Sequence, residues 1–273
     1  KEMIKRSVFF FGVVLITVLS LVPFLWFLLT SLKSPGQITA IPPELIPEFH
    51  TGFYRSALET YGLLRYIGNS AIVAGATTLI SITIGSLAAY AIARFRLSWT
   101  RWYLMALLAV SMFPQIAFAG PVWRILNHLG WLNTYQGIIA PYIALSLPLA
   151  VWILTTFFKE LPYEIEEAAL VDGCTRLQAL RKVVLPLAAP GLFTAAILVF
   201  IHAWNEFFFA LLILTNPRLQ TLPVGIALFP GEYTMPWGEI AAASTIATLP
   251  LILLTLLFQR RIVRGLSGGA VKG

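Results

Sequence analysis

The chain has 273 residues, of which 58% are hydrophobic and only 11% are charged, whereas roughly 25% are charged in a typical soluble domain. So few charges cannot coat a soluble particle of 30.2 kDa, and a chain rich in aromatic residues is not intrinsically disordered. The net charge of +7 does not indicate nucleic-acid binding, because the basic residues flank apolar runs and therefore report membrane topology. The single cysteine, Cys174, excludes an internal disulfide and a Cys-based metal cluster.

Long apolar runs predict an all-α, polytopic membrane protein with six transmembrane helices, since a span needs about 20 apolar residues. The fifth run continues past Glu206, and the others lie between charged residues. The first run resembles a signal peptide, but no small-residue cleavage site follows Thr30, so we expect a retained anchor. The expected spans are residues 8–30, 69–93, 102–122, 137–158, 190–214 and 240–259.

The distribution of Lys and Arg predicts the orientation of these spans. The N-terminus, residues 94–101, residues 159–189 and the tail after residue 259 together carry 14 basic residues, and the opposite ends carry 5. Because cytoplasmic segments carry the excess of Lys and Arg, we expect both termini to be cytoplasmic. The chain is thus expected to be a multi-pass protein of the inner or cytoplasmic membrane.

Several prolines lie inside predicted spans, where each either kinks its helix or is simply tolerated; among them are Pro23, Pro114, Pro148 and Pro250. Pro190 differs, because it stands where a first helical turn is expected to begin.

The second predicted span carries small residues at every fourth position, which predicts a face that packs closely on another helix. These residues are Ser81, Gly85, Ala89 and Ala93. Asn69 and Ser70 open the same span, and we expect them to cap it.

Two predicted outer segments, 34–66 and 215–239, are rich in proline and aromatic residues. The first includes a regular amphipathic piece around residues 53–64. Outer aromatic residues either contact a partner or a sugar, or lie at the bilayer interface. The sequence leaves both roles open.

The predicted cytoplasmic loop 159–189 holds five of the twelve acidic residues. It is expected to form two short helices around a break. Pro162 can open the first helix, with acidic residues near its positive end. Gly173 fits the position just after that helix, where a positive φ is easy for glycine. Pro186 and Pro190 then redirect the chain into the fifth span.

The spacing in this loop is specific. Glu167-Ala168-Ala169 is followed after three residues by Gly173, after nine more by Val183, and after one more by Leu185-Pro186. This pattern resembles the E-A-A loop of importer-type ABC transporter permeases, in which Ile usually stands at the position of Val183. In that family the loop is a coupling helix that docks into a cleft on the ATP-hydrolysing subunit. The resemblance implies that coupling depends on Glu166, Glu167, Ala168, Ala169, Asp172, Gly173, Leu185 and Pro186.

The resemblance extends over nearly the whole chain and is weakest in segments 34–66 and 215–239. The sequence Ala203-Trp204-Asn205-Glu206-Phe207 and the chain end 260–273 look like the second permease of carbohydrate importers of the maltose and trehalose type. This implies a type I ABC importer permease fold in a single transmembrane domain over residues 1–273. It also implies four kinds of partner: a homologous second permease, two ATPase subunits, an extracytoplasmic sugar-binding protein and the lipid bilayer.

The chain lacks a G-x-x-x-x-G-K-[ST] phosphate loop and an H-E-x-x-H zinc motif. We therefore expect a transport subunit that is not an enzyme and that itself binds no cofactor, metal or nucleic acid. ATP and Mg are expected to be used by the partner ATPase subunits.

Glu206 is the only charged residue inside a predicted span, where a charge costs about 2.5–3.5 kcal/mol. His202 lies four residues earlier and therefore on the same helical face. This polar patch either lines the translocation path for a sugar or forms a buried network that fixes helix contacts. The candidate path residues are Asn205, Glu206, His202, Trp204, Gln115 and Asn69.

Three functions remain to be weighed. The first is a permease subunit of an ATP-driven importer of a di- or oligosaccharide such as trehalose or maltose, working by alternating access. The second is a proton-coupled secondary carrier that uses Glu206 and His202 as a relay. The third is a membrane enzyme, which would need a nucleophile or metal cluster at the interface. The E-A-A spacing favours the importer.

Overall fold

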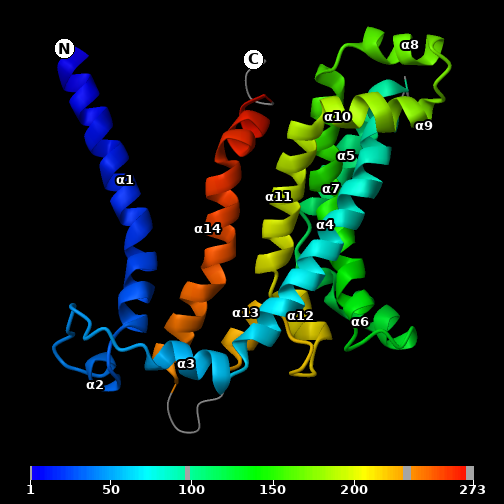
Figure 1. Ribbon diagram of the computed structural model, residues 1–273. Helices are drawn as coiled ribbons and strands as arrows, with labels where there is room; N and C mark the ends of the chain where they lie inside the picture. Colours follow the sequence, from blue (N-terminus) through cyan, green and yellow to red (C-terminus); the bar gives the residue numbers. More distant parts are fainter. Residues whose placement is uncertain (1, 96–98, 230–234, 269–273) are drawn as a thin grey trace. The chain divides into compact units, whose positions relative to one another are not determined.

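The computed structural model describes residues 2–95, 99–229 and 235–268 (Figure 1). Within these ranges the chain forms helices and no strand, which confirms the all-α prediction. In chain order the elements are α1 (Glu2–Ser31), α2 (Pro35–Ile38), α3 (Gly52–Glu59), α4 (Leu63–Arg94), α5 (Thr100–Ser111), α6 (Gln115–His128), α7 (Tyr135–Glu160), α8 (Tyr163–Val171), α9 (Arg176–Ala179), the π-helical turn η1 (Leu180–Val184), α10 (Leu185–Leu187), α11 (Ala189–Asn205), α12 (Phe208–Ile213), α13 (Leu222–Ala227) and α14 (Trp237–Gly268).

Four helices are long and apolar enough to cross a membrane: Lys5–Ser31, Leu63–Arg94, Tyr135–Glu160 and Trp237–Gln259. They contain four of the predicted spans. Two further pairs of helices reach the same length and composition only if each bent pair is counted as one span. The described residues therefore hold four to six candidate spans.

The predicted span 102–122 is divided between two helices, and of the two roles expected for Pro114 the structure shows the kink. α5 ends at Ser111, α6 begins at Gln115, and the two axes differ by 90°. Pro114 explains the break, because it has no backbone N–H and disfavours helical backbone in the residue before it. Its own ψ of 125° is extended.

The predicted span 190–214 is likewise divided between two helices. α11 ends at Asn205, Glu206 is extended with φ −68° and ψ 125°, and a short helix resumes at Phe208. Pro190 lies in the first turn of α11, as expected. The other prolines assigned to spans, Pro23, Pro148 and Pro250, lie inside helices that continue through them.

The chain groups into two compact units, Lys1–Arg65 with Gly225–Ile252 and Tyr66–Val224 with Leu253–Gly273. In the first unit, Tyr54 of α3 shares a 2.7 Å hydrogen bond with Ser31 at the end of α1. Tyr61 stacks on Phe229 with the ring centroids 4.3 Å apart. Aromatic and hydroxyl contacts thus hold the short helices of this unit.

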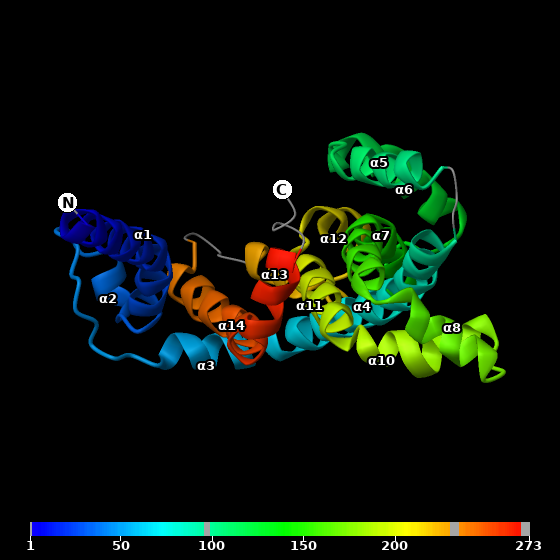
Figure 2. The same cartoon turned by 90° about the horizontal axis from the view of Figure 1, so that it is seen from above.

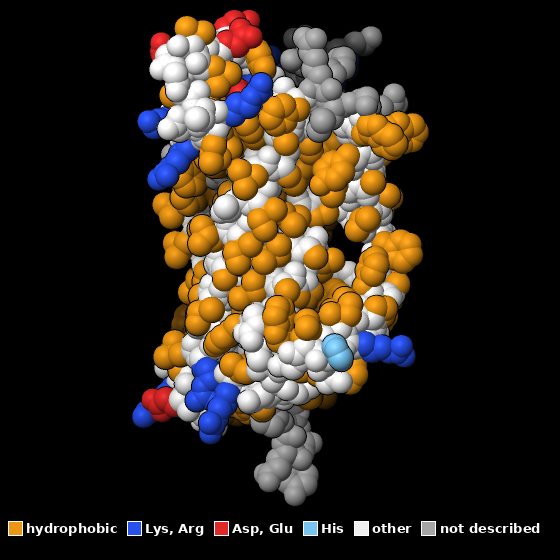
Figure 3. Space-filling model, turned by 90° about the vertical axis from the view of Figure 1, so that its right-hand side faces the viewer, with side chains coloured by type: hydrophobic (Ala, Val, Ile, Leu, Met, Phe, Trp, Pro, Cys, Tyr) orange, Lys and Arg blue, Asp and Glu red, His pale blue; other side chains and the backbone are white. Residues whose placement is uncertain are grey.

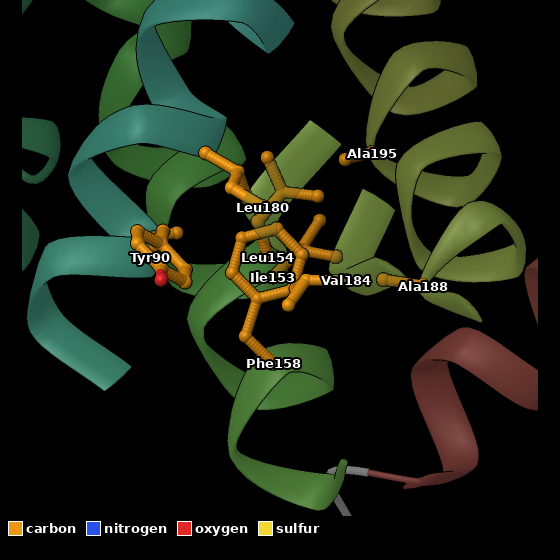
Figure 4. Packing of buried hydrophobic residues seen from close by; sticks show 9 residues of the cluster. Tyr90, Ile153, Leu154, Phe158, Leu180, Val184, Ala188 and Ala195 are labelled. Carbon is orange, nitrogen blue, oxygen red and sulfur yellow. The ribbon is translucent and has the colours of Figure 1, made fainter. Parts of the chain in front are cut away.

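In the second unit, α4, α7 and α11 lie side by side (Figures 1 and 2). The small residues of α4 face α7, as predicted, since a Cβ added to Gly85 would lie 3.2 Å from the Cβ of Ala150. Buried side chains from α4, α7, the π-helical turn and α11 form one hydrophobic cluster (Figure 4). Its members are Ala89, Tyr90, Ile153, Leu154, Phe158, Leu180, Val184, Ala188 and Ala195.

On the face shown in Figure 3, hydrophobic side chains cover the middle and charged side chains lie at both ends, with most of the acidic ones at the end where Figure 1 shows α8. An apolar middle between charged ends is the pattern of a chain whose helices lie in lipid.

Candidate functional site

The first helix of the loop, α8, begins as the sequence predicts. Pro162 is its N-cap, and Glu164 and Glu166 lie in its first turn. Pro lacks the N–H that a first turn leaves unpaired, and carboxylates are stabilised at the positive end of a helix. Local chemistry is therefore sufficient to start α8 at this point.

The end of α8 is a Schellman motif. The N–H of Cys174 donates to the carbonyl of Ala169 at 3.0 Å, and the N–H of Gly173 donates to the carbonyl of Leu170 at 3.1 Å. Gly173 has φ +86°, which confirms the predicted positive φ. No atom lies within 4 Å of where a Cβ would stand on Gly173, so backbone conformation and not space requires glycine here.

The second helix of the loop begins with a capping box between Thr175 and Gln178, with bonds of 2.8 and 3.3 Å. It continues through the π-helical turn to Leu187 and meets α11 at a bend of 80°. Leu185 is half-buried beside the hydrophobic cluster, and Pro186 is exposed. The loop thus forms two short helices around the break at Gly173, as expected.

The predicted coupling residues of α8 divide into two faces. Glu166 and Ala169 are buried, whereas Glu167, Ala168, Asp172 and Gly173 are exposed. The exposed face carries two carboxylates next to a small side chain and a glycine. Such a surface lets another protein approach the helix closely.

The buried residue Glu166 is bound to the end of α4. Its Oε2 lies 2.8 Å from Nε of Arg94, and the two side chains are only 2% and 5% exposed. Its Oε1 accepts a hydrogen bond from the hydroxyl of Tyr90. Both carboxylate oxygens therefore have partners within this chain.

The Arg94 guanidinium contacts two further elements. Nη1 and Nη2 each donate to the carbonyl of Leu161 at 3.3 Å, and the guanidinium carbon lies 5.5 Å from the ring centroid of Tyr163. Sequence analysis missed Tyr90 and Arg94, because it used Arg94 only as a topology signal.

The polar patch at the end of α11 is arranged around the backbone of the next helix. The Glu206 carboxylate accepts hydrogen bonds from the N–H groups of Phe209 at 3.0 Å and Ala210 at 3.2 Å. The hydroxyl of Tyr142 donates to the Glu206 carbonyl at 3.2 Å. Glu206 is 7% exposed, so its charge is held at the N-terminus of α12, where the helix dipole favours it.

The other polar-patch candidates near Glu206 in the chain contact different groups and differ in burial. His202 Nδ1 lies 3.5 Å from the hydroxyl of Ser146 in α7. Trp204 is buried and stacks on Phe200 with centroids 5.6 Å apart. Asn205 is exposed and donates to the Ile201 carbonyl of its own helix at 2.8 Å.

The remaining path candidates lie elsewhere. Gln115 is half-buried at the start of α6. Asn69 is buried and lies inside α4, which begins at Leu63, so the prediction that Asn69 and Ser70 cap this helix is wrong. The helix starts earlier because apolar and aromatic residues before Asn69 continue it.

Asn69 instead binds the segment that follows α12. Its Nδ2 donates to the carbonyls of Arg218 at 3.0 Å and Gln220 at 2.8 Å, and its Oδ1 accepts from the Tyr135 hydroxyl at 2.8 Å. The neighbouring Ser70 hydroxyl accepts from the N–H of Leu222 at 2.8 Å. These bonds fix residues 218–222 against α4 and join α4 to the start of α7.

Known proteins are similar to this chain over most of its length. The family described as binding-protein-dependent transport system inner membrane component matches residues 81–268. The trehalose/maltose transport system permease protein MalG of Thermococcus litoralis is 42% identical over 283 residues, which cover 100% of this chain and 99% of that protein. The sulfoquinovosyl glycerol transport system permease protein SmoH of Agrobacterium fabrum is 42% identical over 265 residues, which cover 97% of this chain and 93% of that protein.

The fold is similar to that of a solved transporter. A chain in the crystal structure of a bacterial ABC transporter involved in the import of the acidic polysaccharide alginate matches with a TM-score of 0.78 at 22% identity. The match covers 93% of this chain and 96% of that chain.

Proposed function

Since the chain belongs to the family of binding-protein-dependent transport system inner membrane components, we propose that it is the transmembrane permease subunit of an ATP-driven sugar importer. The proposed cargo is a di- or oligosaccharide such as trehalose or maltose. MalG, a relative similar over the whole chain, is named for these two sugars, and SmoH is named for another glycoside.

The observation that carries the proposal is the shape of α8. The helix exposes Glu167 and Ala168 on one face, with the exposed Gly173 just after its end, and is bound to its own chain on the other face. We propose that the exposed face docks into a cleft on an ATPase subunit and that Asp172, Leu185 and Pro186 complete the coupling region. ATP-driven closure of two ATPase subunits would then move α8 and open the spans alternately to the two sides.

The proposed assembly has this chain beside a homologous second permease, with two ATPase subunits and an extracytoplasmic sugar-binding protein. The chain acts as one transmembrane domain in the inner or cytoplasmic membrane, with both termini in the cytoplasm. It is not an enzyme in this assembly and binds no cofactor of its own, because the partner ATPase subunits bind and hydrolyse ATP with Mg.

The proton-coupled carrier is not favoured. A relay needs a carboxylate that is free to exchange its proton with a neighbouring group. Each oxygen of the Glu206 carboxylate accepts a hydrogen bond from a backbone N–H at the start of α12, so both oxygens are bound to backbone. His202 has its 3.5 Å contact with Ser146 and not with Glu206.

Reconstitution tests the proposed function directly. The complex of this chain with the second permease, the ATPase subunits and the binding protein is placed in proteoliposomes, and uptake of radiolabelled trehalose and maltose is measured. We expect uptake that requires ATP and the binding protein and that persists when an ionophore collapses the proton gradient. Uptake by this chain alone, abolished by the ionophore, would support the carrier and contradict the proposal.

A further inference from the structure

We propose that the buried ion pair between Arg94 and Glu166 fastens α8 to the end of α4, so that the two helices move as one body during coupling. Glu166 and Arg94 are thus positioning residues that transmit movement without contacting the ATPase subunit or the sugar. This inference rests on the proposed function and names the step inside this chain that links docking to transport.

The contact uses the whole carboxylate. Oε2 of Glu166 pairs with Nε of Arg94 at 2.8 Å, and Oε1 accepts the hydroxyl hydrogen of Tyr90. Tyr90 and Arg94 are four residues apart on α4 and therefore share one face of that helix. A single side chain of α8 thus binds two successive turns of α4.

The Arg94 guanidinium extends the same connection to α7. Both of its terminal nitrogens donate to the carbonyl of Leu161, the residue at the C-terminus of α7. Arg is suited to this task because its planar fork can direct several donors at once. The ends of α4 and α7 and the start of α8 therefore meet at one cation.

The aromatic residue of this network is continuous with the hydrophobic core. The Tyr90 ring belongs to the cluster that includes Phe158, Leu180 and Val184 (Figure 4). Ala169 is the other buried residue of α8. α8 also packs on α9 and the π-helical turn, and Glu166 adds polar contacts that bind it to α4. The helix after Gly173 joins the hydrophobic cluster through Leu180 and Val184.

A buried ion pair is weak evidence for stability, since hydrophobic residues of similar volume often stabilise a fold as well or better. The hydrogen bonds around the pair, from Tyr90 to Glu166 and from Arg94 to the Leu161 carbonyl, are directional and instead favour one arrangement of the charged groups. Here the arrangement that they favour is the angle of α8 on α4. Glu167, the next residue, is exposed. Of these two adjacent acids, Glu166 would therefore attach α8 to α4, and Glu167 would take part in docking on the ATPase subunit.

The attachment can be measured without transport. Hydrogen–deuterium exchange is followed in residues 163–171 of the purified complex for Glu166→Gln and Arg94→Met. We expect amide exchange at least about tenfold faster than in the unsubstituted complex, because loss of one partner leaves a buried charge unpaired and α8 opens locally. Glu164→Gln is the matched control, since it removes an exposed carboxylate from the same helix, and it should leave exchange unchanged.

The consequence for coupling is measured in proteoliposomes as trehalose or maltose taken up per ATP hydrolysed. We expect Glu166→Gln and Arg94→Met to retain the ATPase subunit and to keep hydrolysing ATP, while uptake per ATP falls by about tenfold. The double variant Glu166→Gln/Arg94→Met leaves no unpaired charge and should assemble at least as well as either single variant. Uptake per ATP should nevertheless remain low in the double variant, because the fixed angle is lost.

The outcomes separate this inference from the proposed function. Unchanged exchange in α8, or uptake per ATP within about twofold of the unsubstituted complex, overturns the inference. Recovery of coupling in the double variant shows that the pair only stabilises the fold and also overturns it, and this variant decides if the single variants do not assemble. Failure of the unsubstituted complex to take up either sugar contradicts the proposed function instead, and the exchange measurement still tests the attachment.

Discussion

The carboxylate of Glu206 accepts a hydrogen bond from the backbone N–H of Phe209 at 3.0 Å. This charged side chain of the fifth apolar run therefore compensates for the break that it creates, because it binds the first free N–H groups of the next helix. The bond explains how an acid is accommodated in surroundings as apolar as the α11–α12 junction.

Glu206→Leu is expected to destabilise the protein, because Phe209 and Ala210 lose a charged acceptor in a buried site. We expect the free energy of unfolding to fall by about 2–3 kcal/mol and Glu206→Gln to lose less, since an amide oxygen still accepts one bond. Thermal unfolding of the purified complex measures both, with Asn205→Ala as the exposed neighbouring control. An unchanged melting temperature together with lost sugar uptake would instead assign the side chain to the translocation path.

The apolar runs predict four of the spans well, because length and hydrophobicity alone decide whether a helix suits a membrane. The length and hydrophobicity of a run do not reveal the helix breaks at Pro114 and Glu206. At Pro114 a missing donor ends α5, and at Glu206 a side chain replaces a helical bond. Neither event changes the average hydrophobicity of the run, so a span count cannot detect it.

In the coupling loop, features set by neighbouring residues were predictable from the sequence, and features set by residues distant in the chain were not. The positive φ of Gly173 follows from glycine after a short helix and was predictable. The inward orientation of Glu166 was not predictable, because it depends on Tyr90, 76 residues earlier in the chain. Sequence spacing therefore locates the loop but does not tell which of two adjacent acids is buried.

Asn69→Ala is expected to release the segment around residues 218–222, because two backbone carbonyls lose their donor. Arg218 is exposed, so trypsin reports this release as cleavage after Arg218. We expect cleavage about tenfold faster than in the unsubstituted protein, as local opening becomes easier. Thr83→Ala is the control, since the Thr83 hydroxyl bonds only to the Leu79 carbonyl of its own helix. Equal cleavage rates in the two variants would show that Asn69 does not hold the segment.

The proposed orientation predicts which exposed sites react from outside the cell. In a Cys174→Ser background, Leu177→Cys in α9 should be shielded from a membrane-impermeant maleimide, and His128→Cys at the end of α6 should be labelled. Both positions are exposed, so accessibility within the chain does not separate them. Labelling after cell lysis, when both should react, is the control, and labelling of Leu177→Cys in intact cells would reverse the orientation.

Glu167→Lys is expected to weaken docking of the ATPase subunit. The side chain is exposed in this chain but would be desolvated in a cleft, where removal of one partner of a charge pair costs about 2–5 kcal/mol. The amount of ATPase subunit retained on purification measures the effect, and Glu160→Lys, exposed at the end of α7, is the control. Full retention in Glu167→Lys would mean that this carboxylate remains in water in the assembly, where exposed pairs contribute little.

Substitutions at Gly173 can separate the effect of backbone conformation from the effect of side-chain bulk. Its φ is +86°, and nothing lies within 4 Å of a Cβ placed there. A Cβ therefore costs about 1–2 kcal/mol through conformation alone. Gly173→Val should reduce sugar-stimulated ATP hydrolysis and retention of the ATPase subunit, since a β-branched residue rarely adopts positive φ. Gly173→Asn should keep most of both, because Asn tolerates this region. If Val is tolerated as well as Asn, the Schellman turn is not needed for coupling. If Asn fails as completely as Val, the absence of a side chain on the exposed face is what the ATPase cleft requires.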